Sequence, residues 1–173
     1  MLDYILSKMV LLIFLLLLVA AFSMVRESLN VYFVQQAAQN LAKSLASDVT
    51  RVLTSVRNTT EVRSYLLPAT LRAGTVSIRY ELNAVVYEKG STKYLGIIVL
   101  DGAGRKWLGF ETVPLGESSK YDVTVHIPKG MDVLAIPSGT EQQYFIVQMT
   151  YTPGTDKTEL DICVKPDPNV PCK

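Results

Sequence analysis

The sequence predicts an α+β protein: a long N-terminal helix, transmembrane at first and amphipathic afterwards, followed by an antiparallel β-sandwich head of the Ig-like type. Three observations predict this fold. Hydrophobic residues fill 21 of the first 25 positions, and neither Gly nor Pro occurs between Leu2 and Arg57. From Tyr65 onward apolar and polar residues alternate, which is the period of a β-strand. The expected regions are the helix over 1–58, the β-sandwich over 65–165 and an irregular tail over 166–173.

The composition excludes several classes of protein. The chain has 173 residues and a mass of 19.2 kDa, with 17 Lys and Arg against 16 Asp and Glu. It therefore has no basic field that would attract nucleic acid. Val, Ile, Leu and Tyr are too frequent after the apolar N-terminus for a disordered chain. Two cysteines are too few for a disulfide-rich scaffold or for a four-cysteine zinc site.

Met9–Val25 is a run of 17 residues without a charge. At about 1.5 Å per residue, a helix over this run is about 25 Å long, at the short end of what crosses a bilayer core. Tyr4 and Lys8 suit the membrane interface, so we expect a retained, single-pass anchor over residues 9–25. A cleaved secretory signal is the alternative, because Val19–Ala21 offers the small residues that a signal peptidase accepts.

The helical pattern continues beyond the membrane run. Apolar residues recur every three or four positions, as they do on one face of an α-helix. A helix of about 55 residues would be roughly 80 Å long, and it needs support from a membrane, a domain or neighbouring helices. The expected helix-packing face consists of Val34, Ala38, Leu41, Leu45, Val49, Val52 and Val56.

The segment Ser28–Ala42 is polar in places but has no charge. It carries two Asn and three Gln among small and apolar residues. Such a surface packs against other helices more comfortably than it sits in lipid, which favours association through the N-terminal helix. A stalk that lies partly on its own domain is the alternative.

Short strands separated by turns are expected after the helix. Gly and Pro cluster between the apolar runs, as is typical of turns. Seven or eight short strands without helical patterns between them indicate an antiparallel sandwich. The clearest strands are Val76–Tyr80, Tyr94–Leu100, Lys106–Phe110, Tyr121–Ile127, Tyr144–Tyr151 and Thr158–Val164.

Few residues indicate catalytic chemistry. His126 is the only histidine, and the alternation around it places it opposite the core face, as a plain surface residue. Asp101–Gly104 has the composition of a phosphate loop, but the strands on both sides of it indicate a hairpin turn. The carboxylates lack the dense spacing of a calcium loop. They are Glu81, Glu111, Asp122 and Asp132. We therefore expect no enzyme, no cofactor and no metal site.

Cys163 and Cys172 lie near the C-terminal end, with three prolines between or beside them. A disulfide between them would stabilise the chain by about 2–3 kcal/mol on the chain-entropy account. It would also hold the tail against the last strand. Free thiols are the alternative.

The architecture resembles that of type IV pilin-like proteins, in which a helix of this kind leads into a small β domain. The archaeal members are the most similar, since Leu67-Pro68 followed by Ile78-Arg79-Tyr80 resembles the approach to their first head strand. The loop between Cys163 and Cys172 is similar in position to the disulfide loop of bacterial pilins. The resemblance implies a helix that lies in the membrane before assembly and in a filament core afterwards.

Two departures from the pilin pattern bear on function. Lys8 stands where a prepilin peptidase would act, but Ser7–Met9 contains no Gly or Ala, and the early glutamate of the family would fall at Ile13. That carboxylate registers a major subunit against its neighbour. The resemblance therefore implies a minor pilin, a filament-associated subunit or an anchored sandwich of the archaellum stator type.

We expect a single-pass, pilin-like cell-surface protein with an extracellular head, in the membrane or in a surface filament. Its expected partners are pilin-like subunits or cell-envelope proteins. Lys8 on the short side, the glycosylation acceptor Asn58 and the cysteine pair favour this orientation. The alternatives are an anchored β-sandwich that binds a surface-layer protein, a glycan or a solute, and a secreted domain released by signal cleavage.

Overall fold

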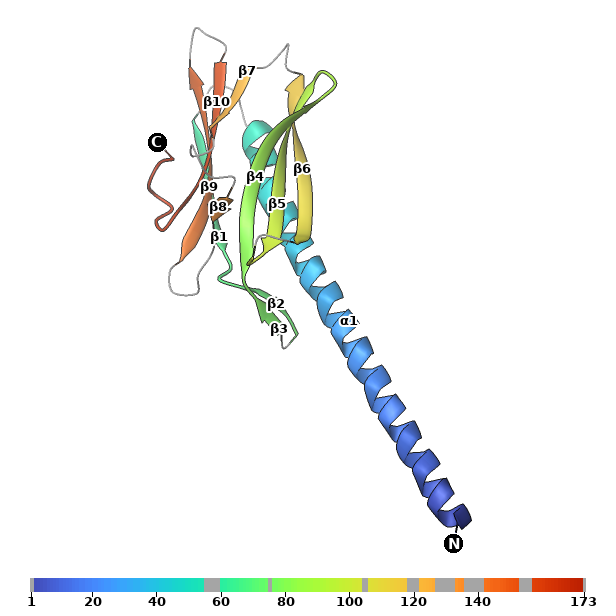
Figure 1. Cartoon of the computed structure of the whole chain (residues 1–173). Coiled ribbons are helices and arrows are strands. Elements are labelled where there is room, and N and C mark those ends of the chain that lie inside the picture. The colour runs from blue at the N-terminus through green and yellow to red at the C-terminus, as the bar shows by residue number, and fades with distance from the viewer. Residues whose placement is uncertain are drawn as a thin grey trace.

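The chain begins with a 53-residue helix that leads into a series of strands (Figure 1). The computed structural model describes residues 2–54, 60–74, 76–103, 106–117, 122–126, 133–135, 142–152 and 157–172. The helix is α1 (Leu2–Thr54). The strands are β1 (Glu61–Leu67), β2 (Leu71–Ala73), β3 (Val76–Ile78), β4 (Tyr80–Lys89), β5 (Thr92–Asp101), β6 (Trp107–Glu117), β7 (Asp122–His126), β8 (Val133–Ala135), β9 (Gln143–Thr152) and β10 (Lys157–Lys165).

α1 is continuous because no residue within it breaks a helix. Its hydroxyl groups bond inside the helix: Ser23 Oγ donates to the Val19 carbonyl at 2.9 Å, and Thr50 Oγ1 donates to the Ala46 carbonyl at 2.8 Å. Arg51 lies in the last turn, where a cation complements the helix dipole. The helix is long and apolar enough to cross a membrane, with a window of mean hydropathy 2.7 that is nowhere buried. Membrane anchors and signal sequences share these properties.

The strands form two four-stranded sheets and a small ribbon. The first sheet has the order β1-β9-β10-β7, the second has the order β6-β5-β4-β8, and β2 pairs with β3 in the ribbon. Most pairs are antiparallel, which confirms the predicted α+β class with antiparallel sheets. β7 is an exception, because it runs parallel to β10. The Ig-like form of the sandwich stays a prediction.

Several strand limits differ from those expected. β1 begins at Glu61 rather than near Tyr65, because its polar first residues pair with β9 from Glu61↔Met149 onward. β6 continues through Pro114, which is tolerated because β6 is an edge strand and needs no ladder hydrogen bond on its free side. The expected strand Val76–Tyr80 is divided at Arg79 between β3 and β4.

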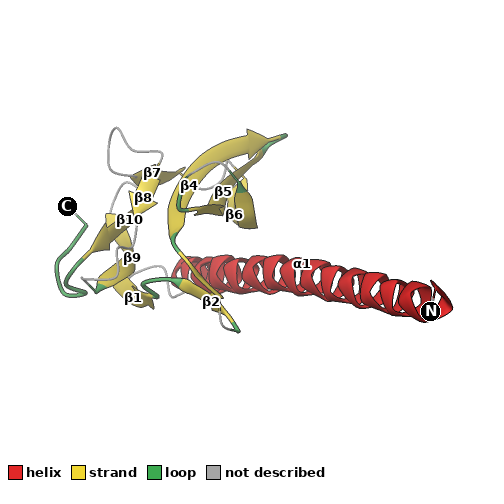
Figure 2. Cartoon of the chain, turned by 60° about the horizontal axis from the view of Figure 1, so that its bottom comes forward, coloured by secondary structure: helices red, strands yellow, loops and turns green. Residues whose placement is uncertain are grey.

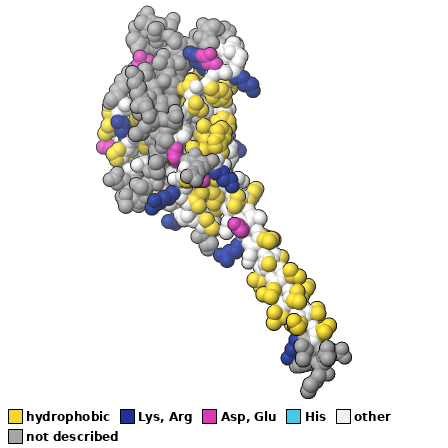
Figure 3. Space-filling model, in the orientation of Figure 1, with side chains coloured by type: hydrophobic (Ala, Val, Ile, Leu, Met, Phe, Trp, Pro, Cys, Tyr) yellow, Lys and Arg dark blue, Asp and Glu magenta, His cyan; other side chains and the backbone are white. Residues whose placement is uncertain are grey.

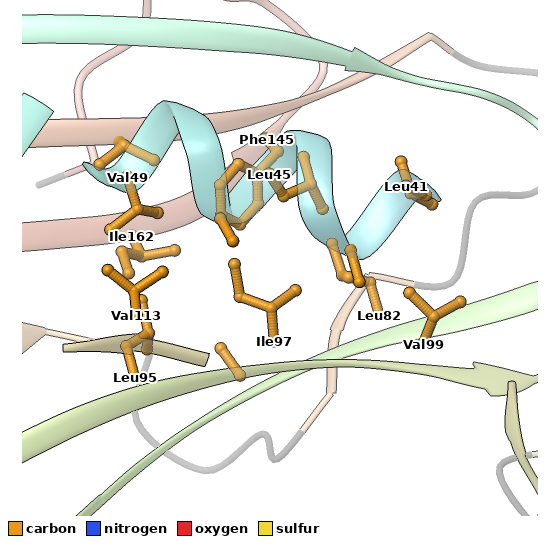
Figure 4. Packing of buried hydrophobic residues seen from close by; sticks show 14 of the residues in the cluster. Leu41, Leu45, Val49, Leu82, Leu95, Ile97, Val99, Val113, Phe145 and Ile162 are labelled. Atoms are coloured by element: carbon orange, nitrogen blue, oxygen red, sulfur yellow. The ribbon is translucent and has the colours of Figure 1, made fainter. Parts of the chain in front are cut away.

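The second half of α1 is part of the core of the head. It lies along the opening between β1 and β6, which are edge strands of the first and the second sheet, respectively (Figure 2). Figure 4 shows Leu41, Leu45 and Val49 of α1 between side chains of the two sheets. Phe145 and Ile162 come from the first sheet, and the second sheet contributes Leu82, Leu95, Ile97, Val99 and Val113. Helix and sheets therefore share one hydrophobic cluster.

Tyr80 places a polar group inside this cluster. Its ring is fully buried, and its hydroxyl donates a hydrogen bond of 2.8 Å to the Pro68 carbonyl. Burial, with a smaller contribution from nearby Tyr65, raises the pKa of the Tyr80 hydroxyl well above its usual value. The hydroxyl is therefore held neutral and joins β4 to the connection between β1 and β2.

Candidate interaction surfaces

The first half of α1 is an uncovered apolar surface. Its large hydrophobic side chains from Leu6 to Phe33 are exposed, and no part of the head covers them (Figure 3). Beyond the 9–25 segment the exposed apolar surface continues through Leu29, Val31, Tyr32 and Phe33. Tyr32 and Phe33 meet edge to face, with ring centroids 5.8 Å apart. A large exposed apolar surface marks contact with a membrane or with another protein.

The expected helix-packing face lies against the head of the same chain. Six of its positions are buried there: Val34, Ala38, Leu41, Leu45, Val49 and Val52. Val56, like the acceptor Asn58, lies outside the described residues. The structure therefore places this face on the chain's own sheets, as in the alternative of a stalk lying on its domain, and the uncovered helix surface lies before Val34.

A close contact fixes α1 to the free edge of β6. The Gln39 amide acts as a strand partner: Nε2 donates to the Phe110 carbonyl at 2.8 Å, and Oε1 accepts from the Phe110 N–H at 3.1 Å. Nε2 also reaches Glu111 Oε2 at 3.1 Å. At Gly109 a Cβ atom would lie only 2.6 Å from the Ala38 carbonyl carbon. Gly109 thus permits the close approach that puts Gln39 within reach of β6.

The second sheet carries an aromatic face directed away from α1. Tyr87 and Tyr94 are stacked with centroids 5.6 Å apart, and Trp107 and Phe110 lie 5.7 Å apart. Trp107 is 62% exposed, although it is an apolar residue. Gly96 lies between the two pairs, since a Cβ atom there would meet both Phe110 and Tyr87. Hydrophobic side chains gather over the β4–β6 side of the head in Figure 3.

An open groove of about 530 Å³ lies between α1 and the connection from β1 to β2. Ala37, Leu41, Pro68 and Leu71 supply apolar walls, and Arg72 is at its rim. No group of three or more His, Cys, Asp or Glu residues in the described part of the chain is arranged to hold a metal ion.

The two cysteines are joined in a disulfide, with Cα atoms 5.6 Å apart. The predicted bond is thus present, and it holds the tail against β10. Within the tail, the Asn169 N–H donates to Asp167 Oδ1 at 2.9 Å. The free-thiol alternative does not apply to this structure.

The remaining candidates fall at separate places. Asp101 lies at the turn between β5 and β6, where its N–H donates to the Lys106 carbonyl at 2.9 Å, as a hairpin requires. Glu81 is on β4 and Glu111 on β6, apart from one another in the second sheet. Three residues that the sequence pattern does not assign to a site lie at least partly outside the described set: the side chains of His126 and Asp122 on β7, and the whole of Asp132.

Comparison of the chain with protein-family models, with curated proteins and with solved structures found no match. The described residues define a β head built around the second half of a helix whose first half is apolar and uncovered.

Proposed function

We propose that the chain is a membrane-anchored, pilin-like structural and interaction protein of the cell surface, either a minor pilin or another filament-associated subunit. One observation supports this most strongly: the same helix supplies an uncovered apolar half and the core of the head. A simple stalk would end at the surface of its domain. α1 is built into the head, so a contact made by its first half acts directly on both sheets.

In this proposal α1 crosses the membrane once, over about residues 9–25, with the N-terminus inside and an Ig-like head outside. The disulfide supports an outside location, because such bonds persist in oxidising compartments. Partners bind the uncovered helix surface around Leu29, Tyr32 and Phe33, where uncharged polar residues accompany the apolar ones.

Site-specific photo-crosslinking in native membranes tests the proposal. A photoreactive residue at Tyr32, on the uncovered surface, is expected to give adducts with a second copy or with another envelope subunit. The matched control replaces Lys43, which is exposed on the part of α1 that belongs to the head. Equal protein adducts at both positions, or none at Tyr32, would contradict assembly through the helix.

An anchored binding module is the second candidate, and the aromatic face favours it. Planar aromatic rings on a sheet face suit stacking against sugar rings of a surface glycan, and Val85, Tyr87, Tyr94, Trp107 and Phe110 carry no charge. The test measures binding of the full chain in detergent to isolated envelope polysaccharide. Tyr94→Ala is expected to weaken binding, whereas Tyr144→Ala, on the other sheet, is the control. Binding that neither substitution weakens would remove this candidate.

Secretion after signal cleavage is the third reading. N-terminal sequencing of the mature protein distinguishes a retained anchor, pilin-type processing and secretion in one measurement. An intact start at Met1 indicates a retained anchor, a start after Lys8 indicates pilin-type processing, and a start after Ala21 indicates secretion.

A further inference from the structure

The end of the head nearest the first half of α1 has a distinctive composition. This proximal end comprises the β2–β3 ribbon, Arg79 and the described residues on either side of the β5–β6 turn, Asp101–Ala103 and Lys106–Trp107, and α1 emerges beside it (Figure 1). A Cβ atom at Gly102 would lie 2.8 Å from Cβ of Arg79, so the turn and Arg79 are in contact. The ribbon and the β5–β6 turn therefore form one surface.

Exposed cations dominate the proximal end. Arg72, Arg79 and Lys106 are exposed. The described acids beside them, Glu81 and Asp101, are only partly exposed, and Asp101 Oδ1 accepts the Lys106 N–H at 3.2 Å. Basic side chains along this end are visible in Figure 3, whereas the adjoining helix carries both a cation and an acid, the exposed Arg26 and Glu27. The proximal end therefore presents a positive surface toward the first half of α1.

Trp107 belongs to the same surface. It is the only tryptophan, it follows Lys106 directly, and it is 62% exposed. Trp is enriched at membrane–water interfaces, where its ring lies at the level of the headgroups. An exposed Trp among cations is typical of a surface that meets lipid headgroups.

The length of helix between membrane and head fits such a contact. Val34 is the first residue of α1 that the head buries, nine positions after Val25, so the two are separated by about 13 Å along the helix. The headgroup layer fills roughly 5–8 Å of this distance. The remainder, about 5–8 Å, does not exceed the Debye length of about 8 Å at physiological ionic strength. Cations on the proximal end therefore lie within the field of an anionic leaflet.

We propose that the proximal end of the head docks on the anionic headgroups of the membrane in which α1 is anchored. The proposal rests on the anchor of the proposed function. Arg72, Arg79 and Lys106 supply the attraction, and Trp107 enters the headgroup layer. Docking sets the tilt of α1 and holds the uncovered residues Leu29–Phe33 at the membrane surface until a partner replaces the lipid contact.

Trp107 provides the measurement. The full chain is reconstituted in vesicles of phosphatidylcholine alone or mixed with phosphatidylglycerol, both containing a headgroup-attached spin label. Flotation of the chain with the vesicles reports the anchor separately. Docking predicts strong quenching of Trp107 emission in the anionic vesicles, weaker quenching in neutral ones and loss of the difference at high salt.

Paired variants distinguish docking from simple proximity. The double variant Arg72→Gln with Arg79→Gln is expected to lower the ratio of docked to free heads about 25-fold. Each charge near an anionic surface contributes about fivefold, and the two contributions multiply. Lys89→Gln with Lys93→Gln removes the same charge from the β4–β5 turn and should leave quenching unchanged. If quenching depends on neither lipid charge, salt nor the arginine pair, and the chain still floats with the vesicles, docking is overturned and the anchor stands. A chain that fails to float would overturn both.

Discussion

Gly109→Ala is the substitution that tests how the helix is joined to the head. In the wild-type chain Gly109 faces the backbone of α1. Phe110, the next residue along β6, forms two hydrogen bonds with the side chain of Gln39. The added methyl group would meet Ala38 and Gln39 backbone atoms at 2.6–2.7 Å. A backbone cannot rotate aside as a side chain can, so α1 and β6 have to separate.

The expected loss follows from these distances. Ordinary contacts of a Cβ atom begin at 3.4 Å, so the helix must move by roughly 0.7 Å or more. Such overpacking costs about 1–3 kcal/mol. The same movement stretches the Gln39 bonds from 2.8 and 3.1 Å beyond useful length, at about 1 kcal/mol for each partly buried bond. We expect Gly109→Ala to lower the free energy of unfolding by about 3–5 kcal/mol, the sum of these terms.

Denaturant unfolding of the full chain in detergent, followed by Trp107 emission, measures this loss. Gly96→Ala is the matched control, because its methyl group meets only side chains, at 3.1 Å, and these can move. We expect it to change stability by less than about 1 kcal/mol. Equal values for the two variants, or a loss below about 0.5 kcal/mol for Gly109→Ala, would refute the close-approach argument.

Three further predictions concern the core, the tail and alkaline pH. Leu45→Asp should unfold the head but leave membrane insertion intact, since it adds a buried charge to a loss of about 3–5 kcal/mol; Lys43→Asp, at an exposed site, is the control, and equal protease resistance of the two would contradict the prediction. Thiol labelling of the denatured, unreduced chain should find neither Cys163 nor Cys172, and reduction should lower stability by about 2–3 kcal/mol; two labelled thiols would exclude the bond. Because the pKa of Tyr80 is raised by folding, its contribution is present below about pH 10 and is lost above it, by up to about 1.4 kcal/mol per pH unit. Tyr80→Phe should flatten that slope in alkaline unfolding curves, and an unchanged slope would refute the assignment.

Much of the fold could be predicted because its signals are local. The absence of Gly and Pro and the apolar stripe predicted α1, and alternation predicted the central strands. Features that depend on distant partners were missed. β1 pairs with β9 despite its polar start, and β7 lies parallel to β10, which is a choice that no local pattern reveals. Pro114 reads as a strand end, and only its place on an edge strand makes it acceptable.

The contact between Gln39 and Phe110 could not be predicted from local sequence patterns either. Gln39 reads as an ordinary polar residue on the solvent side of a helix, and its partner lies far along the chain. Gly109 did offer a signal, because a glycine inside a strand often marks a close backbone approach. The sequence predicted the apolar stripe of α1 but left open whether other helices or the chain's own domain cover it. That outcome depends on the space between β1 and β6, which sequence periodicity does not encode.

The use of α1 as core has a consequence for the order of events during synthesis. The helix is made before the sheets, yet Phe145 and Ile162, which pack against it, follow Leu45 by 100 residues or more. Leu45 and its neighbours therefore lack their partners until β9 and β10 have left the ribosome, and only then does the head close. In that interval the second half of α1 exposes the apolar face that the head later buries. A head made without residues 2–33 should likewise retain Val34–Thr54, since a fragment that starts at β1 loses the helix side of the shared hydrophobic cluster.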